Sequence, residues 1–159
     1  MSTRKKIAAL LVAVLIPEVV GAVAAVATQS SVGTWYPTLV KPWFTPPDAV
    51  FAPVWITLYA VMGVASWRIW ARGSRRARVQ MALAAYGVQL LLNGAWSVVF
   101  FGLQSISGGL VTILFLLTAL GVTIRLFSRV DRLAAWLLAP YLAWTAYATA
   151  LNAALWWLN

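Results

Sequence analysis

Five long runs of apolar residues, separated by short polar segments, dominate the pattern of this chain. Each run is close to the roughly 20 residues that an α-helix needs to cross a hydrocarbon core of about 30 Å. The pattern therefore predicts an all-α integral membrane protein, a bundle of five transmembrane helices in one domain that covers residues 1–159. The expected spans are residues 7–27, 49–67, 79–101, 108–124 and 133–158.

The segment between the first two spans is rich in proline and in aromatic residues. Its four prolines have a fixed φ and no N–H group, which disfavours a long helix or a central strand: Pro37, Pro42, Pro46 and Pro47. Its aromatic side chains are too apolar to remain in water, so we expect them to pack onto the helix ends: Trp35, Tyr36, Trp43 and Phe44. The sequence therefore predicts a long, ordered lid loop between the first and second helices.

The composition excludes several classes of protein. Hydrophobic residues make up 63% of the chain and charged residues 9%, which is not the composition of a soluble globular domain. The chain has no Cys and no His, so it has no disulfide, no His-based catalytic triad and no histidine-ligated haem, and we expect no metal site. A net charge of +9 would suit nucleic-acid binding, but the basic residues lie in short segments between apolar runs, so no nucleic-acid partner is expected.

The basic residues predict the orientation of the helices. They cluster at the N-terminus and in the second and fourth connections: Arg4, Lys5, Lys6, Arg68, Arg72, Arg75, Arg76, Arg78, Arg125, Arg129 and Arg132. The positive-inside rule then places the N-terminus in the cytoplasm and the lid loop and C-terminus outside, and we expect a bacterial cell membrane. The basic start also resembles a cleavable signal peptide, but Pro17 and Glu18 interrupt that pattern, so we expect an uncleaved helix.

Glu18 is the only acidic residue inside a predicted span. It lies about 16 Å from Ile7 along the helix axis, which is near the membrane midplane. One interpretation is structural: a protonated carboxyl donates to the Ala13 carbonyl, which Pro17 cannot bond. The other is functional, through ligand contact or proton coupling, because ionisable groups inside membranes are often functional. The sequence leaves both open.

Polar and aromatic residues share one face of the third span and one face of the fifth. The third offers Gln89, Asn93, Trp96 and Phe100, and the fifth offers Tyr141, Trp144, Ala148 and Asn152. Helix rise places Trp55, Asn93 and Trp144 near the middle or in the outer half of the bilayer, which predicts an aromatic pocket beneath the lid. A planar apolar ligand would stack there, with Lys41 as the candidate contact for an anionic group. The alternative is that these residues only pack helices together.

Several motifs resemble those of the tryptophan-rich sensory protein/translocator protein (TspO/MBR) family, also called peripheral-type benzodiazepine receptors. Between Trp35 and Tyr59 the chain reads WY, L, KPW, PP, VF, W and LY in order, which is highly specific. N-x-x-W at residues 93–96 and PYLxW followed by LN within residues 140–152 reinforce the resemblance. The similarity covers nearly the whole chain.

The resemblance implies a homodimeric five-helix bundle that binds porphyrins such as protoporphyrin IX, sterols and benzodiazepine-type ligands, with no required cofactor. It implies ligand contacts from Tyr36, Trp43, Trp55, Asn93, Trp144 and Ala148, with Asn152 nearby, and we add Trp96 from its helical face. The function expected is sensing, sequestering or transporting tetrapyrroles. Membrane lipids are the other expected partner, with headgroups at Arg68 to Arg78.

Two other functions stay open. Some bacterial relatives are reported to degrade protoporphyrin in light, and the resemblance makes Trp55 and Trp144 the candidate catalytic residues for such an enzyme. A proton-coupled transporter using Glu18 is the other alternative. The chain also departs from the family pattern. It reads LNAALWWLN where animal members carry a sterol-recognition pattern with a Tyr followed by Lys or Arg. This difference places specific sterol binding in doubt.

Overall fold

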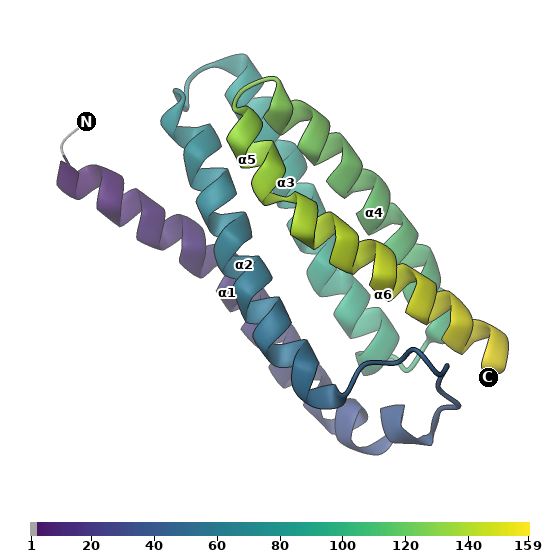
Figure 1. The fold of residues 1–159 in the computed structure, drawn as a ribbon. Coiled ribbons are helices and arrows are strands. Elements are labelled where there is room, and N and C mark those ends of the chain that lie inside the picture. The colour runs from purple at the N-terminus through teal and green to yellow at the C-terminus, as the bar shows by residue number, and fades with distance from the viewer. Residues whose placement is uncertain (1–2) are drawn as a thin grey trace.

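The computed structural model describes residues 3–159, and every regular element in this range is a helix (Figure 1). The long helices are α1 (Thr3–Thr34), α2 (Asp48–Ala71), α3 (Ala77–Ser97), α4 (Ile106–Ser128) and α6 (Ala139–Leu158). The short elements are the 3₁₀-helix η1 (Tyr36–Thr38), the π-helix η2 (Val98–Gly102) and α5 (Arg132–Leu137). The predicted all-helical fold is confirmed.

Four helical segments in residues 3–159 are long and apolar enough to cross a membrane: α1, α2, α3 with η2, and α4. They correspond to the first four predicted spans. The fifth long helix, α6, has 20 residues but is not among these candidates. Its Thr, Asn, Tyr and Trp side chains make it less hydropathic than the other four.

The helix boundaries differ from the prediction at two places. The first helix continues past Ala27 to Thr34, and the hydroxyl groups of Thr28 and Thr34 bond carbonyls one turn earlier in that extension. The predicted helix over residues 133–158 is wrong as one element, because the chain forms α5 and α6 with a break at Leu138. Pro140 explains the break, since it has no N–H group to donate to the carbonyl of Trp136.

The absence of a side chain at Gly63 lets the backbones of α1 and α2 come close together. A methyl group at Gly63 would lie 2.6 Å from the carbonyl oxygen of Ala13 and would also collide with Val14. This is the carbonyl that Pro17 leaves without a helical donor, and α2 covers it. Glu18 makes no side-chain hydrogen bond to any residue from 3 to 159, so the bond to the Ala13 carbonyl, one of the two interpretations of this residue, is not formed.

The C-terminal end of α2 is bonded to the turn between α4 and α5. Asp131 is buried and accepts hydrogen bonds from Arg68 at 2.9 Å and from Arg72 at 2.7 Å, while its other oxygen caps α5 through the N–H of Ala134. Burial alone would raise the pKa of Asp131, but the bonds from Arg72, Ala134 and Arg68 together hold that pKa below its ordinary value. The basic end of the bundle, which carries most of the arginines, is therefore held by a buried carboxylate paired with two partly exposed arginines.

Candidate ligand pocket

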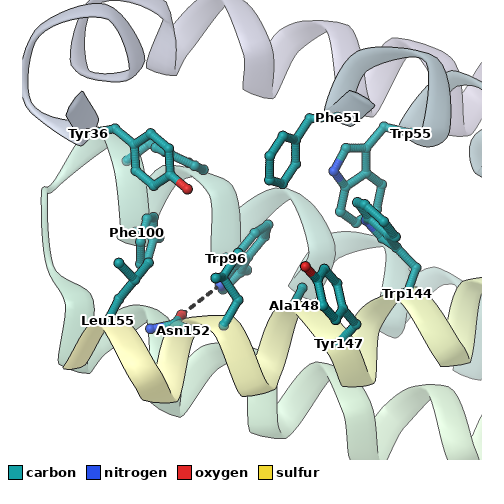
Figure 2. Close-up of a pocket in the computed structure, with 12 residues that line it drawn as sticks. Tyr36, Phe51, Trp55, Trp96, Phe100, Trp144, Tyr147, Ala148, Asn152 and Leu155 are labelled. Carbon is teal, nitrogen blue, oxygen red and sulfur yellow. Dashed lines mark hydrogen bonds between the residues drawn. The ribbon is translucent and has the colours of Figure 1, made fainter. Parts of the chain in front are cut away.

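A small cavity of about 30 Å³ lies between α2, the α3–η2 segment and α6 (Figure 2). Small-molecule sites occupy about 300–1,000 Å³, so a bound ligand requires the lining side chains to move apart. Most of its lining side chains are aromatic or aliphatic: Tyr36, Phe51, Trp55, Trp96, Phe100, Phe101, Trp144, Tyr147, Ala148, Leu151, Asn152 and Leu155. The walls therefore present the aromatic and apolar surface on which a flat apolar molecule would stack.

Two tryptophans from different helices lie side by side at one end of the cavity (Figure 2). Trp55 of α2 stacks on Tyr59 with ring centroids 5.4 Å apart and lies 6.4 Å from the ring of Trp96. Trp144 of α6 meets Phe51 edge to face at 5.9 Å. Such ring pairs are geometrically specific and stabilise one another, so the aromatic surface is preformed.

The π-helix η2 adds two consecutive phenylalanines to the other end of the cavity. Neighbouring residues of an α-helix point about 100° apart, so both rarely reach the same cavity. Here Phe100 and Phe101 both line it, with ring centroids 4.7 Å apart, and both contact Trp96. The wider π-turn is the local distortion that brings them together, and such turns are frequent at functional sites.

The amide of Asn152 lines the cavity but is already occupied by the protein. Its Oδ1 accepts from Trp96 Nε1 at 3.2 Å (Figure 2). Its Nδ2 donates to the carbonyl of Ile106 at 3.0 Å. In contrast, the indole N–H of Trp144 is buried and has no acceptor among residues 3–159. The N–H of Trp144 is thus a donor without a protein acceptor on a residue that lines the cavity.

Asn93 lies beneath the cavity rather than in its wall. Tyr59 Oη donates to Asn93 Oδ1 at 2.7 Å, and Asn93 Nδ2 donates to Tyr141 Oη at 3.0 Å. The side chain joins α2, α3 and α6 and is only 2% exposed. This is the interhelical role that was the structural alternative for such amides.

The structure brings most of the predicted site residues together. Seven of them line the cavity: Tyr36, Trp55, Trp96, Phe100, Trp144, Ala148 and Asn152. Lys41 stands 4.3 Å from the ring centroid of Tyr36, so a cation lies next to one wall. Glu18 is half-buried on α1 and does not line this cavity.

Trp43 departs from expectation. Its side chain is 95% exposed and contacts the ring of Phe44, so the prediction that it packs onto the helix ends is wrong. The hydrogen bond from Thr45 N–H to the carbonyl of Pro42 closes a tight turn. In this turn Phe44 packs against the cluster around Tyr36, and Trp43 points away.

Five lining residues were not predicted: Phe51, Phe101, Tyr147, Leu151 and Leu155. Helical spacing could have indicated four of them. Phe51 precedes Trp55 by one turn, and Tyr147, Leu151 and Leu155 lie on the same face of their helix as Trp144. Nothing in the sequence indicated Phe101, because in a regular α-helix its side chain would point away from the face of Trp96. The π-turn of η2 brings it back to that face.

The fold and the pocket together define a helical membrane protein with an aromatic cavity between its helices. The model of the TspO/MBR family matches residues 13–158, and the chain belongs to this family. The chain is 39% identical over 132 residues to the tryptophan-rich protein TspO of Chlorobaculum tepidum, covering 83% of this chain and 84% of that protein. It is 42% identical over 123 residues to the human translocator protein, covering 77% and 73% of the two chains.

Proposed function

We propose that this protein binds tetrapyrroles such as protoporphyrin IX, and related flat apolar ligands, in the cavity between α2, η2 and α6. The observation that carries the proposal is the convergence of three indole rings, Trp55, Trp96 and Trp144, on one cavity with apolar walls. A macrocycle presents a wide π-face and little polar surface, which suits stacking on such rings. Binding of this kind would serve sensing, sequestration or transport, in keeping with relatives named translocator protein and tryptophan-rich sensory protein.

Each part of the pocket has a role in this proposal. Trp55 and Trp144 hold the macrocycle, and Ala148 leaves room for its edge because it adds only a methyl group to the wall. Lys41 receives an anionic substituent near Tyr36. Asn93 holds Tyr59 and Tyr141 in place below the ligand and does not contact it.

The membrane arrangement proposed with this function has five crossings, with α6 as the fifth. The basic residues then lie on the cytoplasmic side with the N-terminus, and the segment from residue 35 to 47 covers the pocket from outside as a lid. The protein is proposed to be a homodimer. Sterols are a weaker ligand class.

A titration with protoporphyrin IX in the dark tests the proposal. Tryptophan fluorescence of the detergent-solubilised protein should be quenched saturably, and Trp144→Phe should weaken binding. Trp157→Phe is the matched control, because Trp157 is 81% exposed and lies outside the cavity. Unsaturable quenching, or an equal effect of both substitutions, would show that the porphyrin only partitions into the micelle and would refute the proposal.

A second candidate function is light-dependent oxidative breakdown of the bound porphyrin. It is favoured by the position of Trp55, whose ring lies in the cavity wall and stacks on Tyr59 at 5.4 Å, so an oxidisable aromatic pair would contact the ligand. Illuminating the complex in air should produce a new absorbing product, whereas the dark sample keeps its spectrum. Identical spectra in light and dark would show that the protein binds the porphyrin without degrading it.

A further inference from the structure

The segment from residue 35 to 47 has few ways to hold itself in place. Four of its residues are prolines and donate no backbone hydrogen bond. Its internal backbone bonds are short-range turns, such as Thr38 N–H to Trp35 at 3.0 Å and Thr45 N–H to Pro42 at 3.0 Å. Turns of this kind shape the segment locally, so its position over the helices depends on contacts with other elements.

One such contact comes from Tyr147 on α6. Its hydroxyl donates to the backbone carbonyl of Phe44 at 2.6 Å, and the two rings meet edge to face at 6.3 Å. The same tyrosine ring lines the cavity, next to Ala148 and Trp144 (Figure 2). Tyr147 therefore joins a pocket wall directly to the backbone of the segment.

A second contact comes from Asn159, just beyond α6. Its carboxamide pairs with both backbone groups of Val40: Oδ1 accepts from the N–H at 2.9 Å, and Nδ2 donates to the carbonyl at 3.1 Å. Nδ2 also donates to the carbonyl of Leu155 at 2.9 Å, which orients the amide. Figure 1 shows the segment between η1 and α2 passing beside this end of α6.

We propose that the hydroxyl of Tyr147 and the carboxamide of Asn159 fasten the segment over the cavity, and that their release sets the rate at which ligand enters. The proposal rests on the proposed function, since it assumes that the segment is the lid of a binding pocket. Tyr147 is a positioning residue in this scheme. Because its ring forms the wall and its hydroxyl holds the lid, a ligand that displaces the ring also strains the fastening.

Hydrogen exchange tests the fastenings without any ligand. Tyr147→Phe removes one hydroxyl and keeps the ring, and the Thr45 amide reports the turn that contains Phe44. Loss of one hydrogen bond should speed exchange at Thr45 by about 2- to 10-fold. Asn159→Ala should do the same at Val40, whose N–H it bonds. The control is Tyr86→Phe, which makes the same substitution on α3, outside the cavity, where the hydroxyl bonds neither the segment nor any other described residue.

Ligand kinetics test the gating. In stopped-flow mixing with protoporphyrin IX, association should be about 2- to 10-fold faster for Tyr147→Phe and unchanged for Tyr86→Phe. The proposal would be overturned if the amide of Thr45 in Tyr147→Phe and that of Val40 in Asn159→Ala exchanged as slowly as in the wild type. Faster exchange with an unchanged association rate would also overturn it. Should Tyr147→Phe fail to fold, Asn159→Ala carries both measurements. Absence of porphyrin binding in every variant would refute the proposed function instead, and the exchange data would still decide whether the fastenings exist.

Discussion

The two ends of this bundle are built from different interactions. At the basic end, apolar side chains from α2, α3, α4 and α5 are fully enclosed, with Ile69, Phe127 and Ala134 at 0% exposure, and Asp131 binds two arginines beside them. At the other end, large aromatic rings surround a cavity, and two side chains hold a proline-rich segment. A close-packed end tolerates little change, whereas rings around a cavity can move to admit a ligand. The comparison indicates that the basic end provides stability and the aromatic end provides the site.

The largest expected effect comes from removing a ring at the closed end. Phe127→Ala should lower the free energy of unfolding by about 3–5 kcal/mol, because Phe127 is fully buried and stacks on Tyr86 at 6.0 Å. Denaturant unfolding in micelles measures this change. Phe51→Ala is the counterpart at the cavity and should cost distinctly less, since one side of Phe51 already faces free space. Equal losses for the two variants would contradict the proposed division of the bundle.

Charge pairing at the basic end gives a pH-dependent effect. Asp131→Asn should lower stability by about 1–2 kcal/mol at neutral pH, less than a fully buried pair because the Arg72 side chain is 53% exposed. The pKa of Asp131 is lower in the folded state than in the unfolded state. Its contribution is therefore complete above the unfolded value, near 4, and is lost as pH falls further.

Unfolding measured from pH 7 down to pH 3 should show this loss in the wild type and much less of it in Asp131→Asn. Arg132→Gln is the control, because Arg132 is exposed and forms no salt bridge among the described residues. Parallel pH profiles for the wild type and Asp131→Asn would mean that the ion pair adds no stability.

At the aromatic end the predicted effect is on binding and not on stability. Ala148→Leu should weaken protoporphyrin IX binding by about tenfold or more, because the larger side chain projects from a residue that lines the cavity. Fluorescence titration in the dark measures the affinity. Ala146→Leu makes the same change on an exposed face of α6 and should bind normally. Unchanged affinity in a folded Ala148→Leu variant would show that this wall does not contact the ligand.

The two ends also differ in how far the sequence predicts them. Helical spacing predicts which faces of α2, α3 and α6 meet, and Trp55, Trp96 and Trp144 do line one cavity, because side chains three or four residues apart share a face. Helical spacing cannot predict that the amides of Asn93 and Asn152 are both occupied by the protein, since their partners come from other helices. Nor does it reveal the π-turn at Phe100 or the outward turn of Trp43, which depend on local geometry and not on hydrophobic period.

The smallest effect is expected at Glu18, which belongs to neither end. Glu18→Gln should leave both stability and porphyrin affinity within about twofold of the wild type, because the carboxyl makes no hydrogen bond to residues 3–159 and does not line the cavity. Unfolding and dark titration of the same preparation measure both. A proteoliposome assay adds the decisive control: if transport of porphyrin responds to a pH gradient in the wild type but not in Glu18→Gln, the acid has a proton-coupling role. Flux that ignores the gradient in both proteins would leave Glu18 as a half-buried side chain of α1 with no part in the site.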